Sequence, residues 1–79
     1  MATYTLASVA FHCTDSSLWV IVNDHILDLT EFASEHPGGS DVLLAYAGKD
    51  ATDVFNRAHP GMWEHAKQFI IGKVEPEVD

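Results

Sequence analysis

The 79-residue sequence has a single cysteine, three prolines and only four basic residues. Because Cys13 has no partner, no disulfide can form within the chain, which favours a reducing compartment. No run approaches the roughly 18 apolar residues that a membrane span needs. The N-terminus also lacks the basic start and long apolar stretch of a signal peptide. We therefore expect a soluble, cytoplasmic protein.

Positive charge is scarce: four Lys and Arg stand against twelve Asp and Glu, a formal net charge of −8. Such a surface repels phosphate backbones, so nucleic-acid binding is not expected. It attracts basic partner proteins and hastens their encounter, although an acidic surface also simply keeps a protein in solution.

Apolar residues are plentiful, at 47% of the chain, and this composition excludes disorder. The length predicts one domain over residues 1–79, with 74–79 as a tail. A chain this short buries only about 60% of the surface that its unfolded form exposes. A metal, a partner chain or an embedded cofactor would therefore help to stabilise it.

The strand signals are short. Ser17–Val22 is apolar and β-branched, ends at the turn pair Asn23-Asp24, and is followed by residues 26–29, which together predict a hairpin. Residues 69–71 form a third strand candidate and residues 3–6 a fourth.

Helix signals occupy most of the remaining sequence. Each expected helix follows a capping residue or a break: 6–11 after Thr5, a turn from Thr30 through Phe32, 41–46 after Ser40, 51–57 after Asp50, and 62–68 after Pro60-Gly61. Several short helices with a few short strands predict an α+β fold.

Two histidines share a local pattern. The first lies in His36-Pro37-Gly38-Gly39 and the second in His59-Pro60-Gly61, 23 residues further along the chain. Proline keeps the preceding residue out of helical geometry, and glycine permits the close approach of a bulky group. Both imidazoles are therefore expected at helix ends, on short turns.

The segments around these histidines supply more apolar side chains than so small a core requires. The candidate lining residues are Phe32, Val42, Leu43, Tyr46, Phe55 and Phe69, together with Val22 and Leu29 of the hairpin. Two neutral imidazoles facing across an apolar slot suit a flat, metal-containing ligand, and haem is the obvious candidate. Zinc suits the sequence less well, because it takes three or four ligands at compact spacing.

With these motifs, the sequence resembles the cytochrome b5 family over residues 4–74. The matching segments are Trp19-Val20-Ile21, Asp28-Leu29-Thr30-Glu31-Phe32, Glu35-His36-Pro37-Gly38-Gly39, Ala47-Gly48-Lys49-Asp50-Ala51-Thr52, Phe55, His59 and Ile70-Ile71-Gly72. The resemblance implies two pairs of short helices that flank a haem and pack on a small mixed sheet. It implies that haem b (protohaem) is held non-covalently between His36 and His59, with Pro37 and Gly38 at the cofactor beside the apolar set.

The resemblance further implies one-electron transfer rather than catalysis, because two axial histidines leave the iron no position for a substrate. Such a carrier works between a reductase, often a flavoprotein, and an acceptor enzyme, and we expect a monomer. A free-standing carrier and the haem domain of a larger oxidoreductase both stay open. The alternative functions are a haem-binding or haem-sensing module without redox turnover, and a hydrolase or zinc protein that uses the histidines.

The sequence departs from microsomal members of the family near the second histidine. The interval from Phe55 to His59 is one residue shorter than theirs, and Pro60 stands where they carry a serine. Met62 is an alternative ligand to His59, and His65 is expected at the rim of the pocket.

Overall fold

The computed structural model describes residues 2–35 and 40–76 of the chain. Its strands form a sheet in the order β1-β5-β4-β3-β2. They are β1 (Ala2–Tyr4), β2 (Cys13–Thr14), β3 (Ser17–Val22), β4 (His25–Asp28) and β5 (Ile70–Val74). β1 runs parallel to β5, whereas the other neighbours are antiparallel. The predicted α+β fold with a small mixed sheet is therefore confirmed.

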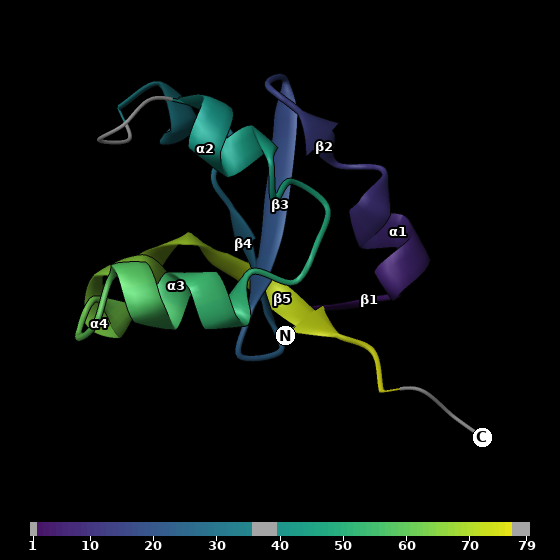
Figure 1. Cartoon of the computed structure of the whole chain (residues 1–79). Helices are drawn as coiled ribbons and strands as arrows, with labels where there is room; N and C mark the ends of the chain where they lie inside the picture. Colours follow the sequence, from purple (N-terminus) through teal and green to yellow (C-terminus); the bar gives the residue numbers. More distant parts are fainter. Residues whose placement is uncertain (1, 36–39, 77–79) are drawn as a thin grey trace.

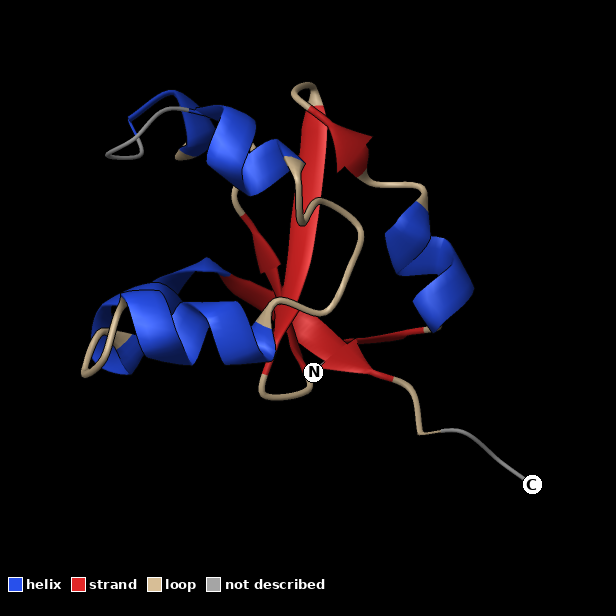
Figure 2. Ribbon diagram, in the orientation of Figure 1, coloured by secondary structure: helices blue, strands red, loops and turns tan. Residues whose placement is uncertain are grey.

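Short helices stand on both sides of this sheet. They are α1 (Leu6–Ala10), the 3₁₀ turn η1 (Ala33–Glu35), α2 (Ser40–Leu44), α3 (Thr52–Ala58), α4 (Trp63–Ala66) and the 3₁₀ turn η2 (Lys67–Phe69). Figures 1 and 2 show α1 on the right of the sheet, with α2 at the upper left and α3 and α4 at the lower left. Within residues 2–35 and 40–76, none of the helices has the length and apolar character needed to cross a bilayer.

The predicted hairpin is formed by β3 and β4, with β4 beginning one residue earlier than expected. Its turn residues Asn23 and Asp24 have φ values of 52° and 64°. Two consecutive positive φ values are typical of a type I′ turn, whose twist matches that of the flanking strands. The turn pair seen in the sequence therefore sets the register of β3 against β4.

Replacing Asp24 by glycine is expected to raise the free energy of unfolding by about 0.5 kcal/mol, because glycine adopts a positive φ without steric cost. Urea unfolding midpoints measure the effect. Asp15→Gly is the matched control, since Asp15 lies in the β2–β3 turn and is not among the described residues with positive φ. A midpoint that falls for both variants would contradict the type I′ explanation.

The helix at the N-terminal end follows the prediction closely. Thr5 is the N-cap of α1, and its Oγ1 accepts the N–H of Ser8 at 3.0 Å. This cap also explains why β1 ends at Tyr4, short of the predicted 3–6. The two-residue strand β2 was not predicted, because it consists only of the pairing of Cys13 and Thr14 with the start of β3.

The prediction that Thr30 caps a helix is wrong. Its Oγ1 accepts the N–H of Leu18 at 2.9 Å and donates to Oδ1 of Asp28 at 2.6 Å. Thr30 thus ties the end of β4 to the start of β3, and the first helical turn after it is η1.

The later elements are shifted by one or two residues from the prediction. Ser40 is the first residue of α2, which ends at Leu44 rather than 46, and α3 begins at Thr52 with Asp50 Oδ1 accepting its N–H at 2.9 Å. β5 begins after Phe69 and includes Val74, where the tail was expected to start.

The segment at 48–51 covers the outer edge of β3 and carries the chain into α3. The N–H of Gly48 donates to the carbonyl of Trp19 at 2.6 Å. The N–H of Ala51 donates to the carbonyl of Ile21 at 2.7 Å. Because Ala51 is the N-cap of α3, these bonds fix where that helix starts relative to the sheet.

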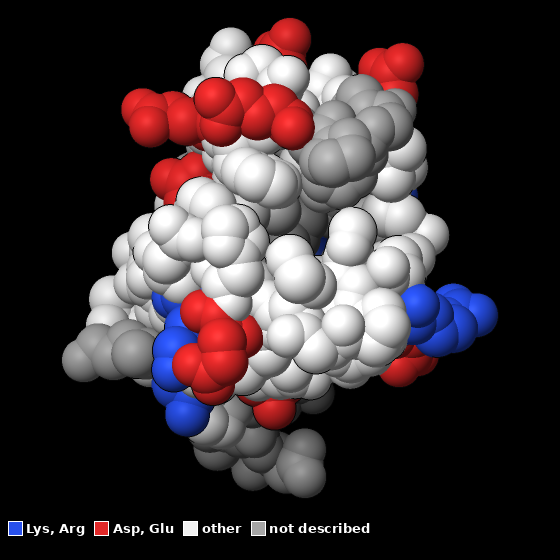
Figure 3. Space-filling view, turned by 90° about the vertical axis from the view of Figure 1, so that its left-hand side faces the viewer, with Lys and Arg blue, Asp and Glu red and all other residues white. Residues whose placement is uncertain are grey.

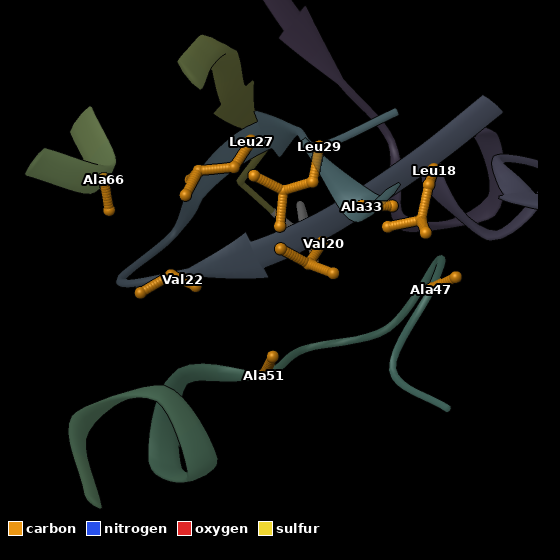
Figure 4. Packing of buried hydrophobic residues seen from close by; sticks show 9 residues of the cluster. All are labelled: Leu18, Val20, Val22, Leu27, Leu29, Ala33, Ala47, Ala51 and Ala66. Atoms are coloured by element: carbon orange, nitrogen blue, oxygen red, sulfur yellow. The ribbon is translucent and has the colours of Figure 1, made fainter. Parts of the chain in front are cut away.

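Alternate residues of the hairpin face opposite sides of the sheet. The cluster on the side of α2 and α3 comprises Leu18, Val20, Val22, Leu27 and Leu29 with Ala33, Ala47, Ala51 and Ala66 (Figure 4). The cluster on the other side comprises Val9, Ile21 and Ile26, with Tyr4, Trp19, Ile71 and Val74 packed against it. Apart from the hairpin residues and Leu29, the first cluster contains only alanines: Ala33, Ala47, Ala51 and Ala66. Their short side chains fill little of the space beyond the sheet.

Candidate functional site

A cavity of about 520 Å³ opens on the sheet face toward α2 and α3, which carries the cluster shown in Figure 4. Its floor consists of Val20, Val22, Leu27, Leu29 and Ala51. One wall, from η1, α2 and the adjoining turns, consists of Phe32, Glu35, Val42, Leu43 and Tyr46. The opposite wall, from α3 to η2, consists of Val54, Phe55, Ala58, His59, Met62, His65, Ala66 and Phe69. Figure 3, which faces this side, shows a hollow bordered by uncharged side chains with acidic groups above it.

The lining is predominantly apolar. Of the eighteen described residues at the cavity, four have side chains that form ordinary hydrogen bonds: Glu35, Tyr46, His59 and His65. Val42 on one wall and Met62 on the other remain 49% and 43% exposed. The volume lies in the range of cofactor and small-molecule sites, and this lining suits a ligand whose body is apolar.

The structure brings together the predicted pocket residues that it describes. Val22, Leu29, Phe32, Val42, Leu43, Tyr46, Phe55 and Phe69 all line the cavity, as does His59. The predicted ligand His36, with Pro37, Gly38 and Gly39, lies outside the described residues. The roles of all these residues toward a cofactor stay predictions.

His59 is positioned by the end of α3. Its N–H donates to the carbonyl of Phe55 at 2.8 Å, and its ring centroid lies 5.7 Å from that of Phe55. At φ −131° and ψ 58° the chain leaves the helix at this residue, and Gly61 continues the turn with φ 79°. The imidazole is half-buried in the cavity wall, at the helix end where the sequence predicted it.

The two walls meet at a pair of aromatic rings. The centroids of Phe32, on the first wall, and Phe69, on the second, are 5.2 Å apart. Tilted aromatic pairs at this distance are favourable beyond the area that they bury. This contact joins the turn before η1 to the end of η2.

Several lining residues were missing from the predicted set. Val20 and Leu27 could have been found by alternation, because each lies two residues before a predicted floor residue. Val54 and Ala58 lie on the helical face of Phe55, so helical spacing identifies them. Glu35 carries no such signal, since it is an exposed carboxylate at an apolar cavity.

The described part of the cavity offers imidazole and thioether donors on a single wall, from His59, Met62 and His65. Elsewhere in residues 2–35 and 40–76, as at the cavity, no three His, Cys, Asp or Glu side chains gather into a metal-binding group. An imidazole set in apolar walls is the environment that haem iron takes as an axial ligand.

Comparisons with known proteins identify related domains. Residues 5–75 match the family model described as "Cytochrome b5-like Heme/Steroid binding domain". Cytochrome b5 type B of Rattus norvegicus is 43% identical over 75 residues, which are 92% of this chain and 51% of that protein. An acyl-lipid (9-3)-desaturase of Physcomitrium patens is also 43% identical over 75 residues, which are 94% of this chain and 14% of that protein.

A solved structure shares the fold. Cytochrome b5 of Ostreococcus tauri virus 2 superposes with a TM-score of 0.82 at 36% identity, covering 91% of this chain and 95% of that one. The family model spans nearly the whole chain, and relatives and structure agree with it. This chain therefore belongs to the cytochrome b5 family of haem-binding, electron-carrying domains.

Proposed function

We propose that this chain binds haem b non-covalently between His36 and His59 and carries single electrons from a reductase to an acceptor enzyme. The observation that carries the proposal is the apolar cavity with the imidazole of His59 in its wall. The residues fit haem: the walls are apolar, the volume of about 520 Å³ is that of a cofactor site, and the donor is one that iron accepts.

When bound, haem supplies an iron that takes up and releases one electron. The protein's part is to hold the ligand geometry constant. The backbone hydrogen bond from His59 to Phe55 and the contact of their rings fix the imidazole against the end of α3. Because His59 is held by a helix end and a tight turn rather than by a long loop, the same geometry serves both oxidation states.

The apolar walls exclude water from the centre of the site, and burial of this kind is one of the levers that set a haem potential. Two imidazoles favour a lower potential than a histidine–methionine pair, since methionine ligation raises it. In this proposal Met62 is a packing residue of the wall and not an axial ligand.

The proposed partners are basic-surfaced redox proteins, because the chain carries a formal charge of −8 and attracts positive charge at long range. The proposal treats residues 1–79 as one monomeric domain in a reducing, cytoplasmic compartment, in keeping with the free Cys13. The desaturase relative, of which this chain spans 14%, supports the view that such a domain also serves inside a larger oxidoreductase.

The proposal is tested by optical titration of the purified chain with haem, followed by reduction with dithionite and addition of carbon monoxide. We expect one haem per chain and a low-spin spectrum in both oxidation states that carbon monoxide does not change, because both axial positions are filled. A high-spin iron that binds carbon monoxide would favour the haem-binding module without redox turnover. A chain that takes up no haem would overturn the cofactor assignment itself.

A further inference from the structure

The α4 wall of the cavity carries a second imidazole whose tautomer is fixed by a neighbour. Nε2 of Gln68 donates to the carbonyl of His65 at 2.8 Å and lies 3.2 Å from Nδ1 of the same residue. An amide NH₂ group has two hydrogens and only donates, so its second hydrogen goes to Nδ1, which accepts it. In the neutral ring the imidazole hydrogen is then on Nε2.

His65 holds this hydrogen at the cavity. The residue lines the cavity and is exposed, and its ring stands edge-on to Phe69 with centroids 6.0 Å apart. Among the described residues, its side-chain hydrogen bonding is confined to Nδ1 and Gln68. The Nε2–H group is therefore available to an acceptor on a ligand.

The other polar groups of the cavity differ from His65. Tyr46 has a hydroxyl that can donate, but it lies on the same wall as Glu35. Glu35 lies on the opposite wall, and an ionised carboxylate accepts hydrogen bonds and repels other anions. His59 is the proposed iron ligand. The ammonium of Lys67, directly after α4, is paired with Glu64 at 2.6 Å. The two walls therefore differ: one presents a carboxylate together with the Tyr46 hydroxyl, and the other presents the donor of His65 with no carboxylate among the described residues that line the cavity beside it.

We propose that His65, held by Gln68, is a positioning residue that hydrogen-bonds a carboxylate of the cavity's ligand. This inference rests on the proposed function: haem b carries two carboxylate side chains on one edge, and the rest of its periphery is apolar. The carboxylate edge enters on the side of His65, where it meets a donor, and away from the like charge of Glu35. His65 thereby selects which edge of the ring lies at the α4 wall.

The test compares haem b with its dimethyl ester, in which both carboxylates are blocked, by optical titration of the wild type and of His65→Leu. Leucine keeps apolar volume at the wall and removes the donor. We expect the affinity for haem b to fall about tenfold and the affinity for the ester to fall less, because the hydrogen bond from Nε2–H to a charged carboxylate is stronger than one to an ester carbonyl. An equal loss for both ligands, or no loss for haem b, would overturn the inference.

Further variants separate positioning from packing. His65→Gln keeps a neutral N–H donor close to the position of Nε2, so it should recover most of the preference for haem b over the ester. Gln68→Leu frees the ring and should lose part of that preference, about threefold. His25→Leu is the matched control, since it makes the same substitution at an imidazole that does not line the cavity, and it should leave both affinities unchanged.

The result also distinguishes this inference from the proposed function. A wild-type chain that binds neither ligand overturns both. A wild type that binds haem b and the ester with low-spin spectra, and a His65→Leu variant that weakens them equally, leaves the carrier function standing and removes only the role of His65. Urea unfolding midpoints within the wild-type range verify that each variant is folded, as expected for an exposed residue.

Discussion

Replacing His59 by alanine is expected to weaken haem binding on the order of a hundredfold, about 2.7 kcal/mol, and to make the reduced iron bind carbon monoxide. The loss is large because the imidazole is at once the proposed axial ligand and part of the wall against Phe55. Alanine leaves both an unfilled coordination position and a void beside an apolar ring. Optical titration followed by reduction under carbon monoxide measures both effects.

Two controls separate the loss of a ligand from the loss of the fold. His25→Ala removes an imidazole that lies outside the cavity, where Nδ1 is 3.0 Å from the carbonyl of Asn23, and it should keep the wild-type spectrum. Free imidazole added to His59→Ala should restore a low-spin spectrum, because it fills the vacated position. His36→Ala should reproduce the behaviour of His59→Ala if the two histidines act as a pair.

A His59→Ala variant that stays low-spin and ignores carbon monoxide would contradict the assignment. Met62 and His65 would then become the ligand candidates, since both line the same wall as His59. The double variants with Met62→Leu and with His65→Leu would identify which of them is coordinated.

Features that depend on neighbours in the sequence were predictable. The pair Asn23-Asp24 predicted a turn, and the structure gives both residues a positive φ. Thr5 predicted a cap, and it accepts the N–H of Ser8. The described pocket residues were predicted for the same reason. Some, such as Val22, follow strand alternation, and others, such as Phe55, follow helical spacing beside a turn that contains proline.

Features that depend on how elements pack together, or on where a helix ends, were not predictable in this way. Threonine is a common helix cap, but the hydroxyl of Thr30 accepts a hydrogen bond from the N–H of Leu18, twelve residues away, and donates one to Asp28. Glu35 reaches the cavity only because η1 packs beside α2, which no local pattern specifies. The hydrogen bonds from Gln68 to His65 depend on where α4 tightens into a 3₁₀ turn, and helix ends of this kind have weak sequence signals.

Truncating Ile26 to alanine is expected to lower the free energy of unfolding by about 3 kcal/mol while leaving the intrinsic affinity for haem unchanged. Ile26 is fully buried in the cluster on the sheet face away from the cavity, with Val9 and Ile21. Removing its methyl and methylene groups leaves a void that neighbouring β-strands are poorly able to close. Since small domains have only about 5–15 kcal/mol of stability in total, this is a large fraction.

The neighbouring residue Leu27 provides the decisive comparison, because it faces the cavity instead. It is 2% exposed, and its truncation enlarges a space that the ligand itself occupies. Leu27→Ala should therefore weaken haem binding as well as lower stability, whereas Leu6→Ala, at a position 48% exposed, should change stability by less than about 1 kcal/mol. Urea unfolding of the haem-free chain gives the stabilities, and haem titration under conditions where each variant is folded gives the affinities. If Ile26→Ala reduced the affinity as much as Leu27→Ala, the two faces of the sheet would not be energetically separate, and the stability of the domain could not be altered independently of its site.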